Sequence, residues 1–211
     1  MFKFYDFLRE IGIVVPEQQA SHSNLSADYH YSSSPYKIEE SAKKRIANYL
    51  SSNVLKRLNC GDVSNSNGVI AFSFGDSDDV NQLLAQEVER FHQENPLAVC
   101  YVQQEVAVHL KATPHVSIQN SAYQTTTDVA KAALNDIGLA KITVIAQSWH
   151  AQRCVETCES LGFEVVALRV NDGFPAQDPQ PWVRNPINWI IKESHREVAT
   201  GYEISEQFNL V

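Results

Sequence analysis

The sequence predicts an α/β protein in which a mainly parallel sheet is covered by helices on both faces. Short apolar runs alternate along the chain with longer segments whose apolar residues recur at helical spacing. The clearest unit spans residues 142–170, where an apolar run is followed by a polar turn, a helical pattern and, after Gly162, a second apolar run. This order is typical of two parallel strands joined by a helix, and repeated units of this kind build a largely parallel sheet.

The composition restricts the partners of the protein. The chain has 211 residues, of which 44% are hydrophobic, and a formal net charge of -8 at pH 7. A chain of this size can bury a substantial core. The acidic balance argues against a nucleic-acid partner, whereas a local basic pocket for a small anion is compatible with it.

The sequence predicts neither a metal site nor a membrane span. Cys154 and Cys158 share a face of an expected helix without a third ligand nearby, so we interpret them, with Cys60 and Cys100, as reduced structural thiols. Every apolar stretch is shorter than the ~20 residues that cross a bilayer. The first residues lack the pattern of a signal peptide. We therefore expect a cytoplasmic protein.

We expect two parts, an N-terminal helical and irregular extension over residues 1–60 that packs on the core, and an α/β domain with a C-terminal helix over residues 61–211. In the extension, residues 2–13 carry apolar side chains on one side and predict a short amphipathic helix. Residues 17–36 are rich in Ser, His, Tyr and Asn, which predicts an irregular segment. Apolar residues at helical spacing predict a helix over residues 37–58.

In the α/β domain, we expect strands where apolar residues run together and helices where their spacing is helical. Gly75 marks the turn after the first strand, Pro96 breaks the first helix, and Gly138 ends the second. Val198 and Tyr202 are expected to face the core from the last helix. The expected strands are residues 69–74, 97–102 with a weak continuation over 106–110, 114–118, 142–146 and 164–170. The expected helices are residues 80–94, a segment from Thr126 or Thr127 to Gly138, 150–161 and 185–208.

Gly75 and Asp76 form the first candidate for ligand binding. In parallel sheets, ligands bind beyond the carboxyl ends of the strands, where the first amides of the next helix face the crevice. A glycine there lets a ligand approach the backbone, and Asp76 can contact a ribose or a cation, with capping of the next helix as the alternative. The segment lacks both GxGxxG and GxxxxGK[ST], so neither of these nucleotide-binding loops is predicted.

Thr126 and Asp128 form the second candidate, at the start of the next helix. Hydroxyl and carboxylate groups at a helix start suit capping, and equally they can point into the crevice at the strand ends. In the enzymatic version of this hypothesis, Asp128 orients His150 or contacts hydroxyl groups of the ligand.

The third candidate comprises Gln147, Ser148, His150 and Arg153, which follow the strand expected over residues 142–146. His150 and Arg153 are three residues apart and therefore share a helix face. An arginine can bind a carboxylate or phosphate with two hydrogen bonds, and a histidine can donate to the same anion or transfer protons near neutral pH. We therefore predict that Arg153 fixes an anion and that His150 acts as acid or base; a structural histidine is the alternative.

Arg196 and Glu197, on the last expected helix, form the fourth candidate. An Arg–Glu pair is usually a solvated or structural ion pair. Alternatively, one of the two reaches the pocket and orients His150 or Arg153. Ser148 is not part of GxSxG, and the chain has no HExxH, so neither a serine nucleophile nor a zinc site is predicted.

Three motifs carry a resemblance to a known family. They are TTDVA, from Thr126, VIAQSWHAQRC, which contains His150 and Arg153, and HREVATGYE, which contains Arg196 and Glu197. They are similar to a T-x-E-N-A helix start, a strand followed by (F/W)H-x-x-R-A, and a late R-E. With these motifs, roughly residues 69–202 resemble the SanA/YdcF-like family, a bacterial domain of unknown function.

The resemblance implies a Rossmann-like three-layer sandwich whose pocket is built by the motif residues and the glycine turn. It also makes S-adenosylmethionine a candidate ligand, because one branch of the family is associated with it. The positions that correspond are Gly75, Thr126, Asp128, His150, Arg153, Arg196 and Glu197. The chain departs from the family pattern at Asp128 and Val129, where the family has Glu and Asn, and it has a single glycine at the first turn.

We therefore expect a YdcF-like protein that binds a small anionic or nucleotide-like ligand at the carboxyl ends of the strands. Its reaction stays open between transfer and hydrolysis. The alternative is a non-catalytic binding or scaffold protein related to the envelope-associated SanA-like branch, because the Gly and Asn positions are lost. The sequence makes no prediction about the oligomeric state.

Overall fold

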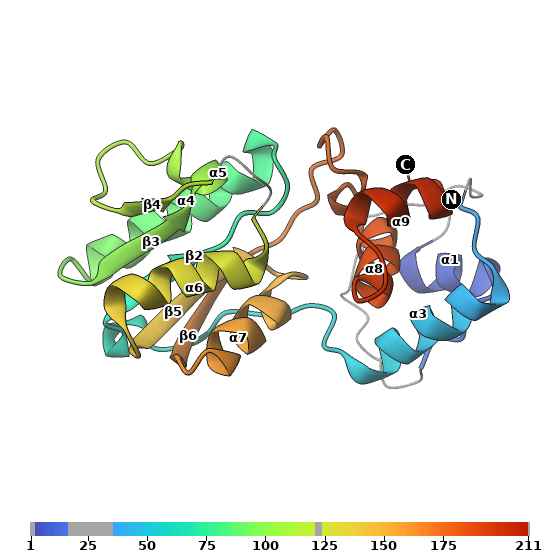
Figure 1. Ribbon diagram of the computed structural model, residues 1–211, viewed down its shortest axis with the longest axis horizontal. Coiled ribbons are helices and arrows are strands. Elements are labelled where there is room, and N and C mark those ends of the chain that lie inside the picture. Colours follow the sequence, from blue (N-terminus) through green and yellow to red (C-terminus); the bar gives the residue numbers. More distant parts are fainter. Residues whose placement is uncertain (1–2, 17–35, 121–123, 211) are drawn as a thin grey trace. The chain divides into compact units, whose positions relative to one another are not determined.

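The computed structural model describes residues 3–16, 36–120 and 124–210 (Figure 1). The chain forms two compact units. The sheet unit is Lys56–Gly173, and the helical unit combines Met1–Leu55 with Phe174–Val211. This division differs from the expected one, because the C-terminal helices group with the N-terminal helices.

The sheet unit has the predicted α/β architecture. Its six strands are ordered β1-β6-β5-β2-β3-β4, and each neighbouring pair is parallel except β1 and β6. The strands are β1 (Cys60–Gly61), β2 (Gly68–Ala71), β3 (Val99–Gln103), β4 (Val116–Ile118), β5 (Lys141–Gln147) and β6 (Glu164–Asn171).

Helices cover both faces of the sheet. On one face, Val144 and Ala146 of β5 join a core cluster with buried residues of α6 (Thr126–Ile137) and α7 (Ala151–Ser160). The helix α4 (Asp78–Glu94) packs against β2, β5 and β6, and its buried residues lie outside that cluster, so it covers the opposite face. Because the central strands are buried on both faces, they read as continuous apolar runs.

The chain returns from β3 to β4 through a short helix, α5 (Gln104–Ala107), where we expected a weak strand over residues 106–110. That expectation is wrong because β4 pairs in parallel with β3, so the connection over residues 104–115 has to reverse the chain direction twice. Val106 and Leu110 are apolar and four residues apart, a spacing that suits a helix as well as a strand.

At the opposite edge of the sheet, the chain forms a two-residue strand, β1 (Cys60–Gly61), where the sequence predicts no strand. Gly61 has a φ of 72°, and a Cβ atom at this position would overlap the backbone of Val166. The close pairing of β1 with β6 therefore requires a glycine. A strand of two residues is too short to show any periodicity, which is why the sequence does not predict it.

The helical unit is held together by apolar faces of its helices. The helix α1 (Phe4–Glu10) buries two phenylalanines and a leucine, in agreement with the predicted amphipathic helix. The helix α3 (Glu40–Ser52) buries Ala42, Ile46 and Leu50 at four-residue spacing, and it packs against α8 (Pro186–His195). The predicted irregular segment lies outside the described residues up to position 35.

The single C-terminal helix expected over residues 185–208 is two helices, α8 and α9 (Gly201–Phe208). The hydroxyl of Thr200 accepts a hydrogen bond from the amide of Glu203, and the carboxylate of Glu203 accepts one from the amide of Thr200. This capping box starts a new helix. Val198 and Tyr202, expected in the core, are exposed because the break turns them outward.

A short 3-10 helix, η2 (Pro181–Val183), precedes α8, and a second one, η1 (Val63–Asn65), follows β1. The side chain of Asn185 caps α8, and Pro186 occupies its first turn. In the part of the chain that the structure describes, no helix is long and apolar enough to cross a membrane.

His195 makes the stability of the helical unit dependent on pH. Its buried ring lies 4.6 Å from the Phe208 ring, measured between centroids. Burial lowers its pKa from 6.5, the hydrogen bond to the Ile191 carbonyl opposes this, and the charge of Arg45 lowers the pKa further. The folded state therefore favours neutral histidine. Below pH 6.5 the unfolded chain binds more protons, so stability is retained above that pH and lost as the pH falls towards the folded-state pKa.

We predict that urea unfolding between pH 8 and pH 5, followed by tryptophan fluorescence, shows stability falling below pH 6.5, with a slope no steeper than about 1.4 kcal/mol per pH unit. Replacing His195→Gln should flatten this slope, whereas replacing the histidine His115 of the sheet unit should leave it unchanged. An equal slope in the wild type and the His195→Gln variant would contradict the assignment.

Candidate functional site

The strand order places a topological switch point between β2 and β5. From β2 the chain proceeds to β3 and β4 on one side, and it then returns to β5 and β6 on the other side. The two central strands pair in parallel from Gly68 with Ile142 to Ala71 with Ile145. In sheets of this kind the connections leave the two strands in opposite directions, which opens a crevice at their carboxyl ends where ligands bind.

The turn after β2 is held by one buried amide. Asn81 is 1% exposed, and its Oδ1 accepts a hydrogen bond from the amide of Phe74 over 3.0 Å. Its Nδ2 donates to the carbonyls of Gly75 and Ser77, both at 3.0 Å. Gly75 has a φ of 74°, as a glycine turn requires. Asn81, a residue of α4, therefore fixes the turn by hydrogen bonds to its backbone. The sequence analysis did not predict this role.

A second buried amide holds the turn after β5. Gln147 is fully buried, and its Oε1 accepts hydrogen bonds from the amides of Trp149 (2.7 Å) and His150 (3.1 Å). Its Nε2 donates to the carbonyl of Gly173 over 2.9 Å. Gln147 is thus occupied by the protein backbone, in contrast to the ligand contact expected from the sequence.

Ser148 is also buried and engaged within the protein. Its hydroxyl donates to Asp172 Oδ1 over 3.2 Å, and its carbonyl accepts a hydrogen bond from the amide of Arg57 over 2.9 Å. Asp172 also pairs with Lys56. The turns after β5 and β6 are therefore joined to each other and to the segment that enters the sheet unit.

His150, Arg153 and Thr126 meet at the carboxyl ends of β2 and β5. Arg153 Nη2 lies 2.7 Å from His150 Nε2, and the hydroxyl of Thr126 lies 3.2 Å from the same nitrogen. The rings of Phe72 and Phe74, at the end of β2, lie 6.4 and 6.2 Å from the His150 ring, measured between centroids. The structure thus brings together residues from the ends of β2 and β5 and the starts of α6 and α7.

The contact with Arg153 determines the form of His150. A guanidinium group can only donate hydrogen bonds, so Nε2 must be the acceptor and the proton of the neutral ring must lie on Nδ1. His150 is 6% exposed, whereas Arg153 is half-buried. The histidine therefore supports the arginine from the inner side, and the guanidinium is the group of the pair that a solute reaches more readily.

Asp128 has a different partner from the one expected. Its carboxylate accepts hydrogen bonds from the amide and the hydroxyl of Thr125, at 2.9 and 2.6 Å, and so completes the capping box of α6. These hydrogen bonds, that of the hydroxyl first, lower the pKa of Asp128. The contact to His150 comes instead from Thr126, the first residue of α6.

Gly75 and Asp76 lie at the mouth of the turn after β2. Gly75 is half-buried and Asp76 is exposed. Because Asn81 takes up the amide of Phe74, the amides that this turn can offer to a ligand start at Gly75. Beyond the end of β5, the first amides of α7, from Ala151 to Arg153, have no carbonyl acceptor within their own helix.

Sequence reasoning also missed two cations near the start of α7. Arg57 Nη1 donates to Gln152 Oε1 over 2.6 Å, and Lys56 forms the ion pair with Asp172. These two residues lie in a segment without regular structure, 84 or more positions before the start of β5 at Lys141, so no local pattern indicates their role.

Arg196 and Glu197, the fourth candidate, belong to the helical unit, whereas His150 and Arg153 belong to the sheet unit. Within the helical unit they line a pocket between α3 and the end of α8. Among the described residues, no group of three His, Cys, Asp or Glu side chains is arranged to hold a metal ion.

Comparisons of the chain with protein-family models, with curated proteins and with solved structures found no match. The resemblance to the SanA/YdcF-like family therefore stays a prediction that rests on its sequence motifs.

We predict that Gln147→Leu destabilises the protein by about 2–3 kcal/mol, because the change leaves buried backbone groups of two turns without their partner. Urea unfolding of the full chain followed by circular dichroism measures this effect. The matched control, Gln93→Leu on the exposed side of α4, should change stability by less than about 0.5 kcal/mol. Equal unfolding midpoints for the two variants would show that Gln147 does not hold the turns.

Proposed function

We propose that the sheet unit binds a small anionic, nucleotide-like ligand in the crevice at the carboxyl ends of β2 and β5. The observation that carries the proposal is the meeting of Arg153, His150 and Thr126 at the topological switch point. Binding there uses a positive side chain and the amides of a helix start, which together favour an anion.

The two ends of the ligand have different surroundings in this proposal. The anionic group, a phosphate or carboxylate, binds Arg153 and the first amides of α7. The remainder extends towards the turn after β2, where Gly75 permits close approach and Asp76 accepts hydrogen bonds from ribose hydroxyls. The negative charge of Asp76 disfavours a phosphate at that turn. The orientation of the ligand in the site is therefore fixed.

The two buried amides support this proposal because they make the crevice rigid before a ligand arrives. Asn81 and Gln147 fix both turns by hydrogen bonds to their backbone. A site that is already ordered loses little conformational entropy on binding, which increases affinity. Rigid turns on strand ends are also the usual support for precise polar contacts.

His150 acts in this proposal by positioning Arg153. Its near-complete burial and the hydrogen bond at Nε2 favour this role over proton transfer, and the cap formed by Asp128 leaves that carboxylate away from the histidine. The proposal is therefore one of ligand binding, with S-adenosylmethionine as one candidate beside nucleotides and sugar phosphates.

We predict that AMP raises the Tm of the wild-type chain, by an amount that corresponds to about 2.7 kcal/mol when its concentration is 100 times Kd. Arg153→Gln should weaken binding by about tenfold or more, because a charge-assisted hydrogen bond is lost. Arg90→Gln is the control, since it removes the same charge near the far end of α4. Thermal unfolding with AMP, adenosine and S-adenosylmethionine measures these shifts.

Equal AMP shifts in the wild type and the Arg153→Gln variant would contradict the role of the arginine. If adenosine or S-adenosylmethionine raises the Tm of the Arg153→Gln variant as much as that of the wild type, the site recognises the adenosyl group and not the anion. The absence of a shift with every probe would contradict the proposal as a whole.

We predict that His150→Gln retains AMP affinity within about threefold, because an amide oxygen can accept the hydrogen bond of Arg153 in place of Nε2. His150→Leu should weaken AMP binding by about tenfold, because the guanidinium loses its inner support. Isothermal titration calorimetry measures both values of Kd. Unchanged affinity in His150→Leu would show that His150 does not position Arg153.

A further inference from the structure

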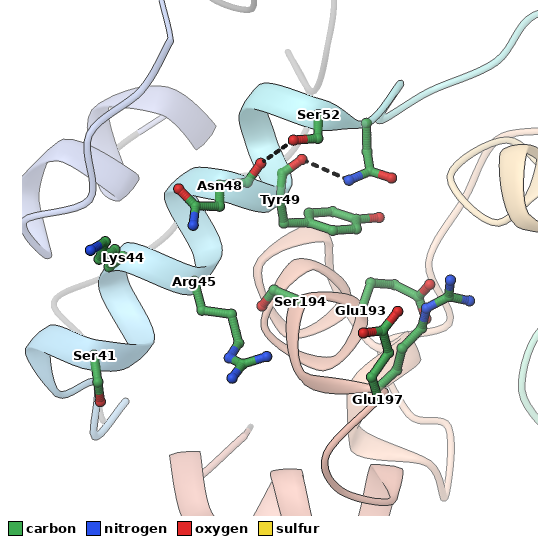
Figure 2. Close-up of a pocket in the computed structure, with 11 residues that line it drawn as sticks. Ser41, Lys44, Arg45, Asn48, Tyr49, Ser52, Glu193, Ser194 and Glu197 are labelled. Atoms are coloured by element: carbon green, nitrogen blue, oxygen red, sulfur yellow. Dashed lines mark hydrogen bonds between the residues drawn. The ribbon is translucent and has the colours of Figure 1, made fainter.

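The helical unit contains a polar cavity of about 530 Å³ between α3 and the end of α8 (Figure 2). Its volume lies within the range of small-molecule sites. Positions 41, 45, 48 and 52 of α3 line it, at the spacing of one helix face, while Ala42, Ile46 and Leu50 form the buried face of the same helix. The helix therefore presents one apolar face to the core and a separate polar face to the cavity.

The walls of the cavity carry more positive than negative charge. Lys44 and Arg45 come from α3 and Arg196 from the end of α8, against the carboxylates of Glu193 and Glu197. Glu193 is 2.7 Å from the ammonium of Lys192 in a buried ion pair and is thereby compensated. Glu197 alone remains to balance three cations.

The three cations of this cavity form no direct ion pairs. Among the described residues, no carboxylate lies within ion-pair distance of Lys44, Arg45 or Arg196. By contrast, Lys43, the neighbour of Lys44 on α3, pairs with Glu40. In a chain of net charge -8, three cations around one cavity with a single unpaired carboxylate, Glu197, favour the binding of an anion.

Two observations place the charge of Arg45 at the α8 side of the cavity. In Figure 2 the side chain of Arg45 extends from α3 towards Ser194. The same charge contributes to the lowered pKa of His195, after burial as the main cause. Arg196 lies at the end of α8, where a positive charge stabilises the carboxyl terminus of the helix. That effect does not explain the cations on α3.

We propose that this cavity is a second binding site, which takes a small phosphorylated molecule with free hydroxyl groups, such as a sugar phosphate. Arg45 and Arg196 bind the phosphate, because guanidinium groups match phosphate oxygens in geometry and charge. Glu197 accepts hydrogen bonds from the hydroxyls, and Ser194 adds a further hydroxyl at the wall. The polar lining disfavours an apolar ligand.

The test uses the full chain carrying Arg153→Gln, so that anion binding by the sheet unit is weakened, and its readout is a residue of the helical unit. Inorganic phosphate, glucose 6-phosphate and glucose are titrated while NMR follows the ring resonances of His195. We expect saturable shifts with both phosphates, tighter binding of glucose 6-phosphate, and no response to glucose. Phosphate near Arg45 should also raise the pKa of His195, because it compensates the nearby positive charge.

Two further variants locate the binding. Arg45→Gln and Arg196→Gln, both at exposed positions, should each weaken phosphate binding by tenfold or more, whereas Lys43→Gln serves as the matched control on α3 and should bind as the parent does. Shifts that are absent, or that are equal in Arg45→Gln and Lys43→Gln, would overturn the proposal. Equal affinity for phosphate and glucose 6-phosphate would overturn its assignment to a sugar phosphate. Because the Arg153→Gln background is common to all samples, these outcomes are independent of AMP binding in the sheet unit.

Discussion

The architecture of the sheet unit depends on how the backbone polar groups of the turns after β2 and β5 find their hydrogen-bond partners. Parallel strands end abruptly at the carboxyl edge, and the chain must turn there without water to satisfy its amides and carbonyls. Asn81 and Gln147 supply these partners from side chains that are almost completely buried. The side-chain amide of Asn or Gln both accepts and donates hydrogen bonds. A single such residue can therefore bind both N–H and C=O groups of the turn backbone.

This arrangement decides which groups remain for chemistry. The amides of Phe74, Trp149 and His150 are taken up by the two side chains, so they are withdrawn from any ligand. The guanidinium of Arg153, the first residues of α7 and the glycine turn lie at the carboxyl ends of β2 and β5, where the proposed ligand binds. His150 then serves as an acceptor that fixes the arginine, and burial by the phenylalanines at the end of β2 keeps it in place.

The sequence predicted the fold class better than the hydrogen-bond partners of the candidate site residues. Apolar runs and helical spacing are local signals, and they correctly predicted β2, β5, α4 and α7. The same signals missed the break before α9, although the T-x-x-E pattern at Thr200 indicates it. The sequence shows Asn81 only as a polar residue next to Val80, at the start of a helix whose buried face is mainly apolar. Nothing else in the local pattern indicates its role. Arg57 reaches α7 from a distant part of the chain, which no pattern of spacing can predict.

The most direct measurement of the central claim is a titration of the ¹⁵N-labelled chain with AMP, followed amide by amide in ¹H–¹⁵N spectra. We predict saturable shifts at Gly75 to Ser77 and at Ala151 to Arg153, with little change at Gly68 and Lys141 on the amino edge of the same strands. Saturable shifts confined to the amino edge or to other elements, or no shift at concentrations up to tens of millimolar, would contradict this claim.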